Sequence, residues 1–431
     1  MEVPARLRQA RSALLLIFLV HGAVFALLVT RIPAIQDRYG LSDAMLPLFL
    51  AAVPLLAGAG SLTAVRLVRR VPATTVVRVV QPVLCLAVIG VGTGDAAWHL
   101  ALALAVFGLL TGAMEATLNM SGVAIEHRFG HSVMLRFHGS ASLGGILGAS
   151  LAWAGAHWDV PLGLLYAGAV AVLLPLAAGV GPRLSRGVHE RTAAPVPRAP
   201  GGRGVPWKPL LPLCLIMGVA VIADSTATNW SAKFLEDTLH SSEAMATVPY
   251  TLYMVATLIG RGFGDVWVRR WGAAAVIRTG ALLAAAGFAV VATAPGPWFG
   301  VLGFGVLGAG LSVMIPQLFS LGAEALPDAP DTAIARVNLF NYVGFLLGPP
   351  LIGAVGAGVS YRVAMAVPLV LVLTVLLVGR SVGRGGPART GSDAVPGPVP
   401  DAVSGPVPAP VLVPVPLDGP TDRPAASHTA G

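Results

Sequence analysis

Within its first 380 positions the sequence contains twelve apolar stretches, each long enough to cross the ~30 Å hydrocarbon core of a bilayer. A chain inside a bilayer must satisfy its own backbone hydrogen bonds, so only helices or a closed barrel can span it. Barrel strands would alternate apolar and polar residues, whereas these stretches are continuously apolar. We therefore predict helices over residues 12–30, 44–64, 74–94, 97–119, 137–157, 161–181, 210–230, 244–262, 273–294, 298–322, 337–357 and 362–379.

The basic residues fall almost entirely on one side of this predicted topology. When the loops are assigned alternately to the two sides, the N-terminus, the even-numbered loops and the tail, together with the span ends that adjoin them, hold all but four of the 28 Lys+Arg residues. The four on the other side are Arg31, Arg38, Lys233 and Arg362. Such an excess marks the cytoplasmic side of a membrane protein. We expect a multi-pass protein of the inner (cytoplasmic) membrane with both termini in the cytoplasm.

The composition agrees with an integral membrane protein and narrows its partners. Charged residues make up 11% of the chain and apolar residues 55%, which excludes an ordinary soluble domain. In a soluble protein the net charge of +8 would suggest nucleic acid. Here the basic residues face anionic lipid headgroups, so the bilayer is the expected partner and nucleic acid is not. The two cysteines, Cys85 and Cys214, lie in apolar spans and provide no metal framework.

Two breaks in the apolar pattern define the predicted domains. Residues 182–209 are rich in Pro and Gly and hold six basic residues, which is typical of a cytoplasmic linker. The linker separates a six-helix half at 1–181 from a second at 210–379. Residues 380–431 are rich in Pro, Val, Gly and Ala, which predicts a disordered, extended tail.

The two halves are related by an internal repeat with a period of 200 residues. Arginines are informative here because they are scarce, and four of them recur 200 positions later. Arg69, Arg70, Arg78 and Arg136 match Arg269, Arg270, Arg278 and Arg336. In the same register, the acid Asp43 matches the acid Glu243. An even number of helices in each half gives both repeats the same orientation. Parallel halves about an axis normal to the membrane are a transporter architecture.

At this point the chain resembles the major facilitator superfamily, over residues 12–379. The loop after the eighth predicted helix reads Gly264-Asp265 followed by Arg269-Arg270 and Gly272, which is similar to a glycine–acid–basic motif of that family. The first copy of the motif carries Val65 where the acid belongs. The resemblance implies an all-α fold of two parallel six-helix pseudo-repeats. It makes Asp265, Arg269 and Arg270 candidates for conformational gating.

A closer resemblance is to the fucose-permease-related branch of this superfamily. It rests on Glu115-x3-Asn119 with His138 downstream, and on Asp224 with Asn229-Trp230-Ser231 in the seventh helix. In the family, helices 1, 4, 7 and 10 line a central cavity. Glu115 aligns with a glutamate that the branch uses for proton-coupled sugar binding. The branch's sugar permeases place an acid in helix 1, where this chain has His21.

Ionisable residues inside the spans are candidates for proton coupling, because each costs about 3 kcal/mol to insert. The candidates are the two carboxylates that lie clearly within spans, Glu115 and Asp224, and His21 near the middle of the first span. Each has a structural alternative. Glu115 could hydrogen-bond to a neighbouring helix, Asp224 could lie hydrated near the outer mouth, and His21 could be a satisfied core histidine.

Amides and one further histidine are candidates for the substrate cavity. Amides donate and accept hydrogen bonds, which suits hydroxylated ligands, although they also bond helices to one another. His138, at the inner end of the fifth helix, is either a gating or an interfacial residue. Gln317 follows Pro316 in the tenth helix, and Asn338 and Asn341 lie at the start of the eleventh. The candidates are Asn119, His138, Asn229, Gln317, Asn338 and Asn341.

Other functions find little support in the sequence. His127 and His131 have a metal-like i, i+4 spacing, but they flank Gly130 in a predicted loop and are expected to be solvated rather than to bind metal. Neither lysine belongs to a Gly-Lys-Ser/Thr phosphate loop, which argues against an ATP-driven pump. We expect a monomeric secondary transporter without a cofactor, moving a small polar or sugar-like solute with protons by alternating access. Proton-antiport efflux of drugs or metabolites is the close alternative, and a membrane sensor or polytopic enzyme is disfavoured.

Overall fold

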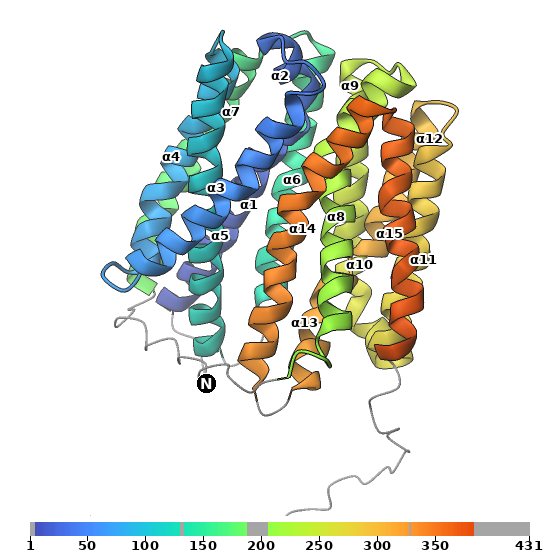
Figure 1. The fold of residues 1–431 in the computed structure, drawn as a ribbon. Coiled ribbons are helices and arrows are strands. Elements are labelled where there is room, and N and C mark those ends of the chain that lie inside the picture. Colours follow the sequence, from blue (N-terminus) through green and yellow to red (C-terminus); the bar gives the residue numbers. More distant parts are fainter. Residues whose placement is uncertain (1–4, 130–132, 188–205, 327–328, 383–431) are drawn as a thin grey trace, which may run out of the picture. The chain divides into compact units, whose positions relative to one another are not determined.

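The computed structural model describes residues 5–129, 133–187, 206–326 and 329–382, and the regular structure within them is helical (Figure 1). The elements are α1 (Ala5–Val29), α2 (Ile32–Tyr39), α3 (Leu46–Leu67), α4 (Ala73–Thr93), α5 (Ala97–Phe129), α6 (Met134–His157), α7 (Leu162–Gly187), α8 (Leu211–Lys233), η1 (Phe234–Thr238), α9 (Glu243–Ala246), α10 (Val248–Trp271), α11 (Ala273–Ala292), α12 (Pro297–Leu311), α13 (Met314–Ala325), α14 (Pro330–Gly358) and α15 (Tyr361–Val382).

The twelve predicted spans are confirmed as helices. In the part of the chain that the structure describes, nine helical segments are long and apolar enough to cross a membrane. The other three of the twelve are α6, α10 and α15. Large apolar side chains along the helices of the bundle are exposed, including Leu102 (59%), Leu302 (58%) and Val370 (60%). In water such surfaces would aggregate, whereas lipid tails solvate them.

Several boundaries differ from the prediction. The tenth span is broken into α12 and α13, because Pro316 has no N–H to bond the carbonyl of Ser312 and its ring crowds that turn. The eleventh span begins at Pro330, so Asn338 and Asn341 lie well inside α14 rather than at its start. The helix α7 runs to Gly187, into the segment predicted as a linker. The rest of that linker, at 188–205, and the tail from 383 lie outside the described residues.

The helices pair in the same order in both halves, which matches the sequence repeat. The first, second and third helices of each half pack against its fifth, fourth and sixth helices. In the first half these pairs are α1 with α6, α3 with α5 and α4 with α7, and in the second half α8 with α14, α10 with α12 and α11 with α15.

The repeat extends to single contacts between helices. A Cβ atom on Gly108 of α5 would come within 2.7 Å of the carbonyl oxygen of Val53 on α3. A Cβ on Gly308 of α12 would come within 2.5 Å of the carbonyl oxygen of Tyr253 on α10. Both glycine and partner shift by 200 positions. Small residues let membrane helices approach closely, and here they do so at equivalent places in both halves.

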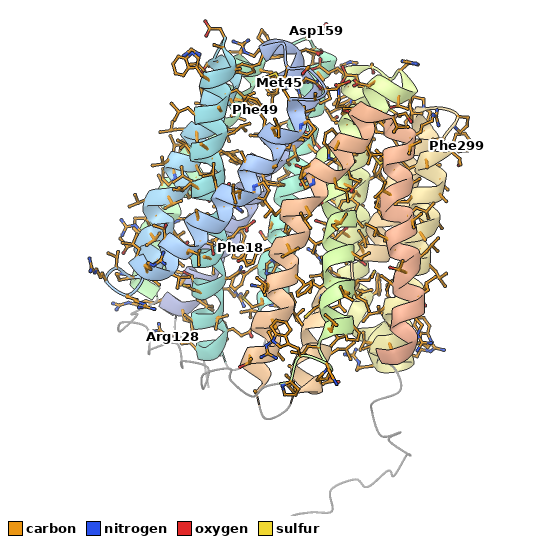
Figure 2. The ribbon with its side chains drawn as sticks, viewed as in Figure 1. Phe18, Met45, Phe49, Arg128, Asp159 and Phe299 are labelled. Atoms are coloured by element: carbon orange, nitrogen blue, oxygen red, sulfur yellow. The ribbon has the colours of Figure 1, made fainter. Side chains whose placement is uncertain are left out.

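The two ends of the bundle need names, because the site is asymmetric along its length. We call the end at which α1 begins the proximal end, and the end at which α1 is followed by α2 the distal end. Arg128, near the end of α5, lies at the proximal end, while Met45 and Asp159 lie at the distal end (Figure 2).

Candidate functional site

A central cavity of about 420 Å³ lies between the two halves. Its lining comes from α1, α3, α5 and α6 of the first half and from α8, α10 and α14 of the second. The volume is within the range of small-molecule sites. Helices 1, 4 and 7 line the cavity as the family resemblance implied. The tenth helix was expected there too, but α12 and α13 contribute none of the described lining residues, while helices 2, 5, 8 and 11 do.

Both predicted intramembrane carboxylates reach this cavity. Glu115 on α5 is accessible from it and makes no hydrogen bond or ion pair with the residues that the structure describes. Asp224 on α8 accepts a hydrogen bond from the hydroxyl of Tyr253, which is buried on α10. One carboxyl group is therefore unpaired on the first half, and the other is tied to a neighbouring helix of the second half.

The two predicted histidines also line the cavity. His21 on α1 is 9% exposed, and its Nδ1 atom has no hydrogen-bond partner among the residues that the structure describes. His138 on α6 is accessible and packs edge-to-face on Phe18, with 5.6 Å between ring centroids. Figure 2 shows Phe18 on α1 between the two ends of the bundle. His21 is thus not the satisfied core histidine that the sequence left as an alternative.

Arg261 is a cavity residue that sequence reasoning missed. The eighth span was predicted to end at residue 262, which placed Arg261 at its very end. The structure extends α10 to Trp271, so Arg261 lies inside the helix and lines the cavity. Its Nη1 atom is 3.5 Å from Ser142 Oγ, and its charge acts on both His138 and Asp224. The sequence did offer a signal, since Arg261 is an ionisable residue inside the predicted span 244–262.

The amide candidates are divided by the structure. Asn229 on α8 lines the cavity, and its Nδ2 atom donates to the carbonyl of Ser225 at 2.9 Å. The remaining four are not part of the described lining: Asn119, Gln317, Asn338 and Asn341.

The gating candidates lie at the proximal end of α10. Arg269 and Arg270 are exposed in its last turn, with the guanidinium of Arg270 5.8 Å from the Trp271 ring centre. The side chain of Asp265 lies outside the described part of the structure. The gating role of these three residues stays a prediction.

Two ion pairs cross between the halves at the distal end. Arg31 Nη2 on the first half lies 2.6 Å from Glu243 Oε1 on the second. Lys233 Nζ on the second half lies 2.9 Å from Asp43 Oδ1 on the first. Arg31 and Lys233 are both 4% exposed, while the acids are partly hydrated. Each half therefore supplies one buried cation and one acid to this contact.

A polar network surrounds the second ion pair. Lys233 Nζ also donates to Gln36 Oε1 at 2.6 Å and to Asp237, and Gln36 Nε2 donates to Asp43 Oδ1 at 2.8 Å. Burial opposes ionisation of Asp43, but the hydrogen bonds from Gln36 and Lys233 and the lysine charge together hold its pKa below its ordinary value of 3.8. Asp43 is therefore ionised throughout the neutral range.

All four basic residues that broke the predicted charge asymmetry are held at the distal end. Arg31 and Lys233 form the crossing pairs. Arg38 Nε donates to the carbonyl of Gly94 at 2.9 Å, and Arg362 Nη1 donates to the carbonyl of Ala294 at 2.8 Å. These cations have structural roles, which explains their presence on the side that is otherwise poor in basic residues.

Comparison with known proteins supports a transport function. The family model described as Major Facilitator Superfamily matches residues 213–411. An uncharacterised transporter of the major facilitator type from Yersinia pestis is 30% identical over 378 residues, which cover 86% of this chain and 94% of that protein.

Two solved transporters have a similar fold. A mutant of the nucleoside transporter NupG matches with a TM-score of 0.70 at 11% identity, over 86% of this chain and 99% of that one. A bacterial homologue of the human lysosomal transporter Spinster, in an inward-facing and occupied conformation, matches with a TM-score of 0.65 at 13% identity, over 89% and 98%. At these identities the likeness concerns the fold alone. The Yersinia relative, together with the matching family model, shows that the chain belongs to the major facilitator superfamily and is a membrane transporter rather than an enzyme.

Proposed function

We propose that this protein moves a small polar solute across the inner membrane by alternating access, coupled to protons through Glu115. The observation that carries the proposal is the unpaired carboxyl group of Glu115 on the cavity wall. A carboxylate in a span is costly, and neutralising it by protonation removes most of that cost. A group that is exposed to the cavity can exchange its proton with whichever side the cavity faces.

Asp224 and His21 are secondary candidates for the same role. Asp224 already accepts a hydrogen bond from the hydroxyl of Tyr253, so its carboxyl group is less free to take up or release a proton when substrate binds. His21 is buried and has an unpartnered nitrogen, which suits a ligand contact as well as a proton. Glu115 differs from both because it is accessible and unpaired.

The substitution Glu115→Gln tests this assignment, because it mimics the protonated form. In proteoliposomes, a transporter carrying one proton per solute accumulates up to about tenfold for a gradient of one pH unit, since that unit is worth about 1.4 kcal/mol. Glu115→Gln should abolish this accumulation while retaining substrate binding and substrate exchange. Glu324→Gln, at an exposed acid on α13, is the matched control and should accumulate like wild type. Gradient-driven accumulation by Glu115→Gln at the wild-type level would refute the role of Glu115.

The orientation in the membrane is part of the proposal. The arginine asymmetry supports a cytoplasmic proximal end, which would put the crossing ion pairs on the periplasmic side. Reporter fusions at Gly202 and Gly391 should then be active only with a cytoplasmic reporter. A periplasmic signal from either fusion would contradict this orientation.

Proton-antiport efflux is the second candidate function. It is favoured by the apolar and aromatic part of the cavity wall, which includes Phe25, Met254 and Phe345. A thermal-shift screen of the purified protein against sugars, amino acids and drugs separates the two. Stabilisation by lipophilic cations, with no response to small polar solutes, would favour efflux.

A further inference from the structure

Arg261 is a charged residue of the cavity that the proposed proton coupling does not use. It lies within α10 and reaches the cavity wall. A guanidinium carries five N–H donors, yet the one hydrogen bond that the structure describes for it is to Ser142 Oγ, at the long distance of 3.5 Å. An arginine in a span normally pairs with an acid or a carbonyl group. Most of its donors therefore have no partner among the described protein groups.

Neither carboxylate of the cavity forms an ion pair with Arg261. Asp224 is close enough for its charge to interact with Arg261, but it forms no ion pair with Arg261, and its described side-chain hydrogen bond comes from Tyr253. Glu115, on the other half, has no contact of this kind with any described residue. The cavity thus holds a cation and two acids that do not neutralise one another directly.

A second polar group without a described partner faces the same cavity from the other half. His21 is nine-tenths buried and lines the cavity, and its Nδ1 atom finds no partner in the described part of the chain. Buried polar atoms are almost always hydrogen-bonded in folded proteins, so an exception at a cavity wall points to a ligand that completes it. Arg261 on the second half and His21 on the first can hold one solute between them.

We propose that Arg261 binds the anionic group of the transported solute, so that the substrates are small acids bearing a carboxylate or a phosphate. The inference rests on the proposed transport function and narrows its substrate class from polar solutes in general. The planar guanidinium pairs with either group through two parallel hydrogen bonds, a geometry that a neutral sugar does not offer. A cavity of about 420 Å³ has room for such an acid of monosaccharide size.

The test measures binding to the purified full-length chain by thermal shift and by calorimetry. The probes are pairs that differ in charge but little in shape: glucuronate with glucuronamide for the carboxylate, and glucose 6-phosphate with glucose for the phosphate. We expect the wild type to prefer one acid over its neutral partner. Arg261→Gln should lower the binding affinity for that acid about tenfold to a hundredfold, as expected for loss of a charge-assisted hydrogen-bonded pair. Arg261→Lys should retain part of the affinity.

The matched control is Arg278→Gln, which removes one exposed arginine of the same half outside the cavity and should bind like wild type. Gel filtration checks that each variant is folded. If Arg261→Gln does not fold, the difference in wild-type affinity between the acidic and the neutral probe tests the inference instead. The inference is overturned if no acidic probe binds the wild type, if the neutral partner binds equally well, or if folded Arg261→Gln binds within twofold of wild type.

This outcome is separable from that of the proposed function. If acid binding depends on Arg261 but Glu115→Gln accumulates substrate like wild type, the coupling role of Glu115 is removed and the acid site remains. Loss of accumulation in Glu115→Gln, with the acidic probe bound equally by wild type and by folded Arg261→Gln, would remove the acid site and leave the coupling role.

Discussion

The crossing ion pairs at the distal end should set the balance between distal-closed and distal-open states. If the transporter works by alternating access, the distal end must open, and Arg31 must then leave Glu243. Breaking this pair should shift the population towards the distal-open state. The size of the shift depends on which partner is removed, because the two side chains differ in burial: 4% exposed for Arg31 and 34% for Glu243.

The magnitudes follow from what each substitution leaves behind. Arg31→Gln leaves a partly hydrated acid and forfeits an ion pair worth about 1 kcal/mol, a shift of about fivefold. Glu243→Gln leaves a buried guanidinium whose remaining described bond is to the carbonyl of Ala152 at 3.4 Å. An uncompensated buried charge costs about 3 kcal/mol, which corresponds to a shift of about a hundredfold. The double variant should resemble Arg31→Gln, because it removes the stranded charge.

Distances between spin labels can measure this shift. Labels at Trp158→Cys and Phe299→Cys would report on the distal ends of the two halves, after the buried Cys85 and Cys214 are replaced by Ala. Figure 2 shows Asp159, next to Trp158, and Phe299 at that end. We expect the long-distance population to rise in the order wild type, Arg31→Gln, Glu243→Gln.

The control removes an acid whose side-chain contact stays within one half. Asp95→Asn removes the contact with His99 at 2.9 Å and should leave the distance distribution unchanged. The reasoning fails if Glu243→Gln gives the wild-type distribution, or if the double variant opens further than Glu243→Gln alone.

Two further results are expected. A Cβ on Gly144 would lie 1.9 Å from the carbonyl oxygen of Leu19, so Gly144→Ala should lower thermal stability and folded yield. Gly168→Ala should not, because a Cβ there would have nothing within 4 Å. Equal melting temperatures of the two variants would contradict the packing argument. Because the pKa of Asp43 lies below its ordinary value, its ion pair is complete at neutral pH and is lost only as pH falls through that lowered pKa. Asp43→Asn should therefore change the transport rate but keep the pH profile of transport between about pH 5 and 8, whereas Glu115→Gln should flatten that profile. A profile flattened by Asp43→Asn would count against this reasoning.

The helices could be predicted from the sequence because apolar length and backbone satisfaction leave few alternatives in a bilayer. Hydropathy does not say where a helix leaves the bilayer, and for this reason the sequence prediction ends the eighth span at residue 262 and leaves Arg261 out of the cavity. The crossing ion pairs were also out of reach, since they depend on how two distant halves pack. Even so, the sequence did single out Arg31 and Lys233, as cations on the side otherwise poor in charge.

The repeat and its violations serve different purposes in this chain. At the distal end, Asp43 and Glu243 occupy equivalent positions, and each meets a cation of the opposite half, so the contact that must open is shared evenly. In the cavity this equivalence disappears. The residues 200 positions away from Glu115, Asp224, His21 and Arg261 are Ile315, Val24, Val221 and Ser61, none of which is charged. A symmetric pair of charges in the cavity would bind two equivalent groups, whereas one small solute with one acidic group needs a single cation. The scaffold thus keeps the symmetry that the motion requires, and the cavity departs from it at the four positions to which we assign proton and substrate binding.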